Sequence, residues 1–185
     1  MQSHTVKLEL LRAGPPHNQL LSPLTPYLAL CGDSSPITLH IAQEHRSFLS
    51  KLERLRYVLS QAAGTVAVPD RVREATADEV GRDVAAIFEQ IPSLLAEISR
   101  THHGASRPAR PGDGDFVHLS LVLGGSELAL IPFEFGFSPQ AYPGEGLELC
   151  LQLARAIVPT RETRRLLPDL PPWDEQRVPK VLLVS

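Results

Sequence analysis

The stretch that decides the fold reads FVHLSLVLGGSELALI and runs from residue 116 to residue 131. Apolar side chains fill every second position of residues 117–123, which is the period of a strand with one buried face. Gly124 and Gly125 follow, and glycine readily adopts the positive φ angles of a tight turn. Residues 127–131 then resume an apolar run. The pattern predicts a β-hairpin with its turn at the two glycines.

Strand patterns also fill the first 42 residues. Residues 5–10 alternate apolar and charged side chains, and two further runs, at residues 27–31 and 37–41, are also rich in apolar side chains. The polar break at residues 32–36 predicts a hairpin between these two runs. Together the segments predict a small meander with one face against a core.

An amphipathic helix is expected from His45 onward. Helical spacing, with charged residues between, relates the apolar residues Phe48, Leu52, Leu55 and Leu59. This helix is expected to end before Gly64.

A second helix is expected to begin at Thr76. Thr76 and Glu79 have the spacing of a capping box, in which both side chains bind free amide groups of the first turn. Pro92 removes a backbone donor and predicts a kink. Both helices are expected to pack on the early strands. The apolar stripe of the second helix comprises Val80, Val84, Ile87, Phe88, Ile91, Leu94, Leu95 and Ile98.

The remaining segments contain shorter apolar runs. Residues 101–115 are polar and rich in glycine and proline, which predicts an exposed loop. Residues 149–158 fit either a strand or a short helix. Residues 181–184 form an apolar run typical of a strand buried on both faces of a parallel sheet. Such a strand needs cover, either from a partner chain or from a further part of a longer protein, and we favour the second.

Composition and charge narrow the class of protein. Hydrophobic residues make up 43% of the 185 residues and charged residues 21%, values typical of a folded globular protein. The net charge of −3 disfavours nucleic acid as a partner. With two cysteines and no leader-like start, the sequence indicates a cytoplasmic protein. No apolar run approaches the roughly 18 residues of a membrane span, so we expect no membrane role.

The reactive residue types favour structural roles. Cys31 and Cys150 lie in apolar runs, where cysteine behaves as a small buried side chain. His40 and His118 are out of phase with the apolar positions of their strands and are expected at an edge or on the surface. The adjacent pair at residues 102–103 has no third ligand at a suitable spacing, so a solvated loop is favoured over a metal site.

Two further stretches, one rich in glycine and one rich in arginine, do not indicate a binding site. Gly144 and Gly146 lack the spacing and the lysine of a phosphate-binding loop. The basic cluster near residue 160 has an interleaved glutamate and is expected to be a solvated face. Its members are Arg155, Arg161, Arg164 and Arg165.

One segment resembles a known family. Residues 128–135, LALIPFEF, resemble the L-x-x-(L/I)-P-(W/F)-E-(L/F) segment at the front of CHAT domains, the caspase-like, often TPR-associated relatives of caspases and separases. The order downstream is also similar: a glycine-rich loop, an apolar stretch into residues 157–161, a proline-rich spacer and the strand pattern at residues 179–184. The likeness covers about residues 116–185. It departs at residues 135–137, Phe-Gly-Phe, where the family more often has an aliphatic pair.

The resemblance implies a division of the chain. Residues 1–100 would be an α+β lead-in of short strands and two helices, residues 101–115 an exposed loop, and residues 116–185 the start of a caspase-like domain. The expected fold is thus an α+β lead-in, with the β-hairpin, running into the first strand of a caspase-like α/β sheet. Glu134, after Pro132, is expected to cap backbone amides.

The resemblance assigns no catalytic residue to this sequence. The histidine and cysteine of the family follow later core strands, and no residue here matches either position. We therefore expect no catalytic, cofactor-binding or metal-binding residue, and no cofactor. The implied function is the N-terminal, non-catalytic portion of a cysteine peptidase that cleaves a protein target, of the kind that acts in bacterial defence or regulated cell death.

The implied partners are the C-terminal catalytic half or chain of the same peptidase, and a protein substrate or regulator. Two alternatives stay open. One is a complete, non-enzymatic adaptor whose open strand at residues 181–184 pairs with a partner's sheet. The other is a pseudo-peptidase that has lost the dyad.

Overall fold

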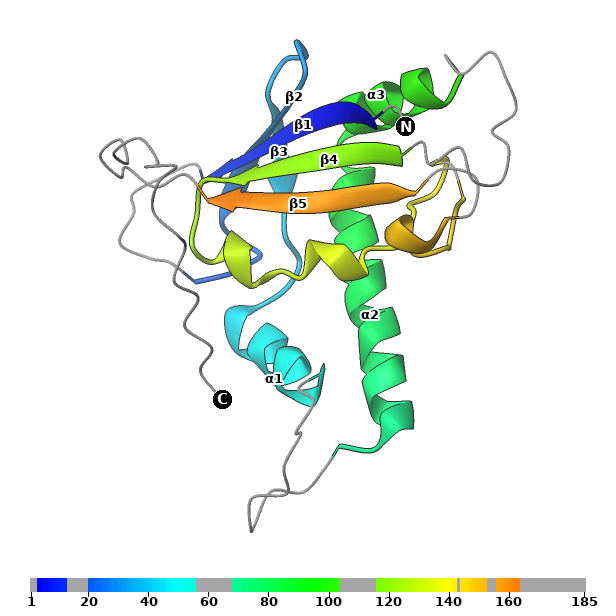
Figure 1. Cartoon of the computed structure of the whole chain (residues 1–185). Coiled ribbons are helices and arrows are strands. Elements are labelled where there is room, and N and C mark those ends of the chain that lie inside the picture. The colour runs from blue at the N-terminus through cyan, green and yellow to red at the C-terminus, as the bar shows by residue number, and fades with distance from the viewer. Residues whose placement is uncertain are drawn as a thin grey trace, which may run out of the picture.

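A mixed β-sheet forms the centre of the fold, with helices against it (Figure 1). The computed structural model describes residues 3–12, 20–55, 68–103, 116–142, 144–152 and 156–163. The five strands lie in the order β3-β2-β1-β4-β5. Their bounds are β1 Ser3–Arg12, β2 Pro26–Cys31, β3 Ile37–His40, β4 Phe116–Leu123 and β5 Ile157–Thr163.

The first three strands form the meander that the sequence predicts. β2 pairs antiparallel with β1, and β3 pairs antiparallel with β2. On the other side of β1, β4 and β5 follow, and each runs parallel to its neighbour. β4 is therefore an interior strand between two parallel partners. Its alternation of buried and half-buried side chains over residues 116–121 confirms the predicted strand period.

Three α-helices complete an α+β arrangement: α1 (His45–Leu55), α2 (Asp70–Glu89) and α3 (Pro92–His103). α2 and α3 pass behind the sheet, and α1 lies beyond the sheet beside the first half of α2 (Figure 1). The predicted apolar stripe is confirmed, because all of it is buried except Leu95, which is half-buried. Apart from Val80, the stripe packs in one core with inward-facing strand residues such as Leu8, Leu10, Leu119 and Leu121.

The expected start of the second helix at Thr76 is wrong. α2 begins at Asp70, directly after Pro69, and Thr76 lies buried inside it. The Thr76 hydroxyl donates to the Val72 carbonyl oxygen at 2.7 Å, an i to i−4 bond that threonine also makes within helices. Glu79 binds a lysine of α1 and caps nothing. The spacing of a capping box can thus also occur in the middle of a helix.

The expected kink at Pro92 is a full break. α2 ends at Glu89, and Pro92 is the first residue of α3, where its missing donor costs nothing. Gln90 secures the junction to β3: its side chain accepts a bond from the His40 amide and donates one to the His40 carbonyl oxygen, each at 3.0 Å. The described chain therefore has three helices where the sequence pattern indicates two.

The expected hairpin at Gly124 and Gly125 is also wrong. After β4 the chain leaves the sheet and forms a 3-10 helix, η1 (Leu128–Leu130). The Gly124 amide donates to the Leu10 carbonyl oxygen at 2.8 Å. A Cβ atom at Gly124 would lie 2.9 Å from the Leu11 side chain, and one at Gly125 would lie 2.8 Å from the Glu127 carboxylate. The two glycines serve close packing and not a hairpin turn.

A buried glutamate explains the path of the chain after β4. Glu127 is 1% exposed, and its Oε1 accepts hydrogen bonds from Arg12 Nη1 and from the Tyr27 hydroxyl, both at 3.3 Å. A buried carboxylate is tolerated only when it is paired. Burial, together with the charge of Glu127, raises the pKa of Tyr27 and keeps its hydroxyl a donor. The partners come from β1 and β2, so no local pattern around residue 127 could reveal them.

The structure confirms or corrects parts of two further predictions. Residues 149–158 contain both alternatives, since a 3-10 helix, η3 (Leu149–Leu151), precedes β5. The loop expected at residues 101–115 begins later, because α3 runs to His103. Residues 104–115 and the strand expected at residues 181–184 lie outside the described residues.

Replacing Glu127 with alanine should lower the free energy of unfolding by about 3 kcal/mol, because the Arg12 guanidinium would stay largely buried without its counter-charge. Urea denaturation followed by circular dichroism measures this loss. The double variant Arg12→Met, Glu127→Leu removes both charges and should cost less than the single one. A loss below about 1 kcal/mol for Glu127→Ala would contradict the assigned role.

Candidate functional site

The segment that resembles the CHAT motif folds back along the lower side of β5 and against α2 (Figure 1). It consists of η1, a short extended link and a second 3-10 helix, η2 (Phe133–Phe135). Leu128, Ile131 and Phe133 are buried and hold the segment to the core. The Phe133 ring stacks on Phe88 of α2 with ring centroids 5.9 Å apart, a favourable aromatic pairing.

Arg161 of β5 joins this segment to the sheet. Its Nη1 donates to the Ala129 carbonyl oxygen at 2.8 Å and lies 3.5 Å from the Ile131 carbonyl oxygen. Its Nε lies 2.7 Å from Glu134 Oε1. A guanidinium suits this task because its planar fork donates in several fixed directions at once. We call Arg161, Glu134 and the two carbonyl groups the Arg161 clamp.

The clamp corrects the expectation for Glu134 and adds a role to Arg161. Glu134 makes no side-chain cap of η2, because its carboxylate is used by Arg161. Arg161 is exposed, as expected of the basic cluster, but its side chain also contacts three groups of the motif segment. The spacing in the sequence could have indicated this contact. Arg161 lies on the same face of β5 as the buried residues Ile157 and Pro159, because every second residue of a strand points to the same side. The other three arginines of that basic cluster lie outside the described residues.

α2 approaches the motif segment at Gly81. The Phe137 amide donates to the Gly81 carbonyl oxygen at 3.2 Å, and Gly81 is buried. A Cβ atom at this position would lie 2.7 Å from the Phe135 carbonyl oxygen and 3.2 Å from the Phe137 ring. The glycine therefore sets how closely α2 packs on η2.

Replacing Gly81 with alanine should destabilise the protein by about 1–2 kcal/mol, although alanine is the better helix former by about 1 kcal/mol. The reason is the clash with the Phe135 carbonyl oxygen, which is backbone and cannot rotate away. Thermal and urea unfolding measure the change. The exposed residue Ala86 of the same helix gives the control, since Ala86→Gly should show only the ordinary propensity loss. A more stable Gly81→Ala variant would refute this packing.

Neither cysteine has the surroundings of a nucleophile. Cys31 is 1% exposed, and burial, with a smaller contribution from the charge of Glu97, raises its pKa to about 11. Burial also raises the pKa of Cys150, helped by Glu134 and Glu148. Catalytic thiols need the opposite, a neighbouring cation or base that lowers the pKa. Cys31 is buried as expected, whereas Cys150 is only half-buried.

The two histidines on strands differ in their position within the sheet. His40 is exposed on β3, an outer strand of the sheet, as expected. His118 faces away from the core as expected, but it lies on the interior strand β4 and not at an edge. Its Nε2 lies 2.6 Å from the Thr160 hydroxyl, and its Nδ1 lies 3.5 Å from the Thr5 hydroxyl. His102 and His103 end α3.

The glycine-rich loop has a structural explanation. Gly144 and Gly146 have positive φ angles of 69° and 77°, which glycine adopts without strain. The Leu147 amide donates to the Gly144 carbonyl oxygen at 2.9 Å, as in a tight turn. Among the residues that the structure describes, no three histidine, cysteine, aspartate or glutamate side chains come together as metal ligands.

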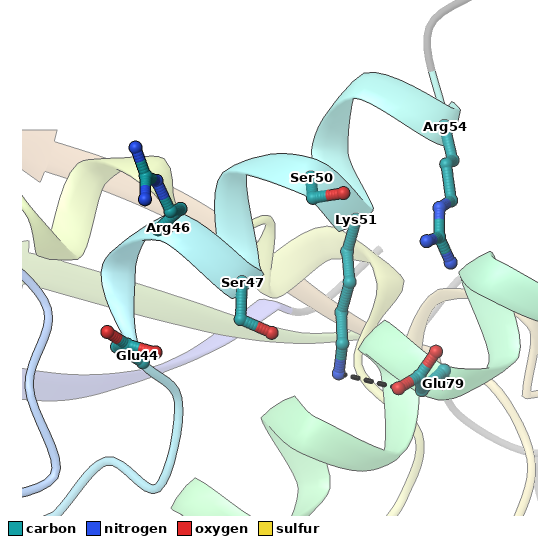
Figure 2. A pocket seen from close by; sticks show the side chains of 7 residues that line it. All are labelled: Glu44, Arg46, Ser47, Ser50, Lys51, Arg54 and Glu79. Atoms are coloured by element: carbon teal, nitrogen blue, oxygen red, sulfur yellow. Dashed lines mark ion pairs between the residues drawn. The ribbon is translucent and has the colours of Figure 1, made fainter.

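An open cavity of about 420 Å³ lies between α1 and α2, and every side chain that lines it is polar. Figure 2 shows Lys51 reaching from α1 to Glu79 on α2, with Arg54 pointing at the same carboxylate. Lys51 Nζ lies 2.7 Å from Glu79 Oε1 and 2.7 Å from Asp83 Oδ2. Burial alone would lower the pKa of Lys51, but the hydrogen bonds to Asp83 and Glu79 raise it. No sequence signal indicates this cavity, because the charged positions that line it resemble any solvated helix face.

Comparisons with protein-family models, with curated proteins and with solved structures found no match. In the part of the chain that the structure describes, no helix is long and apolar enough to cross a membrane.

Proposed function

We propose that this chain is the N-terminal, non-catalytic portion of a CHAT-type, caspase-like cysteine peptidase. In this proposal it acts in the cytoplasm and positions or regulates a catalytic half, which cleaves a protein target in defence or regulated cell death. The catalytic half would carry the histidine and cysteine, with the thiolate attacking a peptide carbonyl group. No residue of this chain would take part in that step.

The observation that carries the proposal is the Arg161 clamp. The resemblance rests on two separate stretches, residues 128–135 and residues 157–161, with a variable loop between them. In the structure, Arg161 of the second stretch binds Glu134 and two carbonyl groups of the first. If the two stretches belong to one structural motif, they should contact each other. If each resembled the family by chance, no contact between them would be expected.

The sheet topology supports the same proposal. β5 runs parallel to β4 at one end of the described sheet, and within the described ranges no strand pairs with its outer side. Parallel sheets in α/β domains are extended by further strands of the same direction. The proposal places the strand expected at residues 181–184 in this continuing sheet.

A specific observation also favours the adaptor alternative. Phe135, Leu147 and Leu151, which lie on or next to η2 and η3, are exposed by 44%, 58% and 69%. These 3-10 helices contact each other and β5, so apolar side chains lie near the edge of β5 with which no described strand pairs. A partner that adds a strand could use both features.

The intact mass of the natural gene product, detected through a peptide from α2, tests the proposal. We expect a mass well above 20.3 kDa, or a co-purifying chain that carries the histidine and cysteine. A cysteine-reactive peptidyl ketone should then label that additional part. A mass of 20.3 kDa with no co-purifying peptidase chain would overturn the proposal and favour the adaptor.

A further inference from the structure

The cavity between α1 and α2 has the donors to hold an oxyanion. Ser47, Lys51 and Arg54 lie on one stripe of α1 and line the cavity (Figure 2). Their hydroxyl, ammonium and guanidinium groups are all hydrogen-bond donors, and two of them are cationic. Three donor groups along a helix suit a phosphate, which offers three acceptor oxygens, better than a planar carboxylate.

Glu79 occupies the position that such an anion would take. Its carboxylate lies 2.7 Å from Lys51 Nζ, and Arg54 points at it from the next turn of α1. The hydrogen bond from Lys51, aided by the charges of Lys51 and Arg54, lowers the pKa of Glu79. The side chains on α1 thus already stabilise one negative group at this point.

The two acidic partners of Lys51 differ in how easily they can leave. The Glu79 side chain is 49% exposed, whereas that of Asp83 is 21% exposed. An exposed ion pair contributes little, so Glu79 can rotate into solvent at a small cost. Asp83 would keep Lys51 in place, and the ammonium would have a donor free for a replacement anion.

The polar lining and the size of the cavity define the class of ligand. About 420 Å³ lies within the range of small-molecule sites, roughly 300–1,000 Å³, and the seven side chains that line it are all charged or carry a hydroxyl group. We propose that this cavity binds a small phosphate monoester, whose phosphate displaces Glu79 from Lys51 and Arg54. Glu44, which lines the cavity at the end away from Glu79, would accept a hydrogen bond from a hydroxyl or amine of the ligand.

Titration of this chain with inorganic phosphate and with O-phosphoserine, at constant ionic strength, tests the proposal. Amide chemical shifts report binding residue by residue. We expect saturable shifts confined to α1 and the first half of α2. Glu79→Gln removes the competing carboxylate and should tighten binding of both probes about tenfold, while Lys51→Met should abolish saturation. O-phosphoserine should bind more tightly than phosphate if the remainder of the ligand is also recognised.

Lys7 provides the matched control, because it also forms a lysine–glutamate ion pair, with Glu9 at 2.8 Å, but lies on the sheet. Lys7→Met should leave phosphate binding unchanged. The proposal is overturned if neither the wild type nor Glu79→Gln shows saturation, or if Glu79→Gln binds no more tightly than the wild type. Equal weakening by Lys7→Met and Lys51→Met would also overturn it, since that result means unspecific attraction. Circular dichroism confirms that each variant is folded.

Discussion

One arginine side chain connects β5 to the segment from η1 to η2 in the described fold. The segment from η1 to η2 has backbone hydrogen bonds of its own, such as those from the Ile131 amide to the Leu128 carbonyl oxygen at 3.1 Å and from the Phe135 amide to the Pro132 carbonyl oxygen at 3.0 Å. Arg161 reaches this segment from β5 and adds contacts to the Ala129 and Ile131 carbonyl oxygens and to the Glu134 carboxylate. The contact fixes β5 to the same segment that α2 covers from the other side, so sheet, motif and helix share one junction.

A second polar cluster acts in the same way at the end of β1. Glu127 is buried between Arg12 and Tyr27, and it ties the start of η1 to the first two strands. Glu127 lies just before η1, whereas the Arg161 clamp includes the Ala129 carbonyl group within η1 and Glu134 after it. Between them they hold the chain out of the sheet after β4, and this allows β5 to pair with β4 in parallel.

The sequence predicted well those features that depend on local periodicity. The strand at residues 5–10, the hairpin of β2 and β3, the start of α1 and the apolar stripe of α2 and α3 all follow from spacing of apolar side chains. The wrong predictions arise where the same sequence pattern is compatible with two different local structures. The hydroxyl of Thr76 binds a carbonyl oxygen within the helix in place of a cap, and Gly124 and Gly125 give room for close packing in place of a hairpin turn.

The candidate site was harder to predict than the fold for a related reason. Arg161 reads as one member of a basic cluster, and Lys51 as one charge on a solvated helix face. Their roles come from partners in distant elements: the carbonyl groups of η1 and its link for Arg161, and two carboxylates of α2 for Lys51. A single sequence holds no signal for such pairs. The resemblance of residues 128–135 and 157–161 did bring together the stretches that contain Glu134 and Arg161.

The central claim is that Arg161 binds the motif segment to β5, and a double-mutant cycle between Arg161 and Glu134 tests it most directly. Unfolding free energies of the wild type, Arg161→Ala, Glu134→Ala and the double variant give the coupling energy. Because the two side chains are 35% and 41% exposed, we expect a coupling of about 0.5–1 kcal/mol. Arg161→Ala should cost more than Glu134→Ala, since it also loses the carbonyl contacts. A coupling near zero with equal small losses for both single variants would contradict the account.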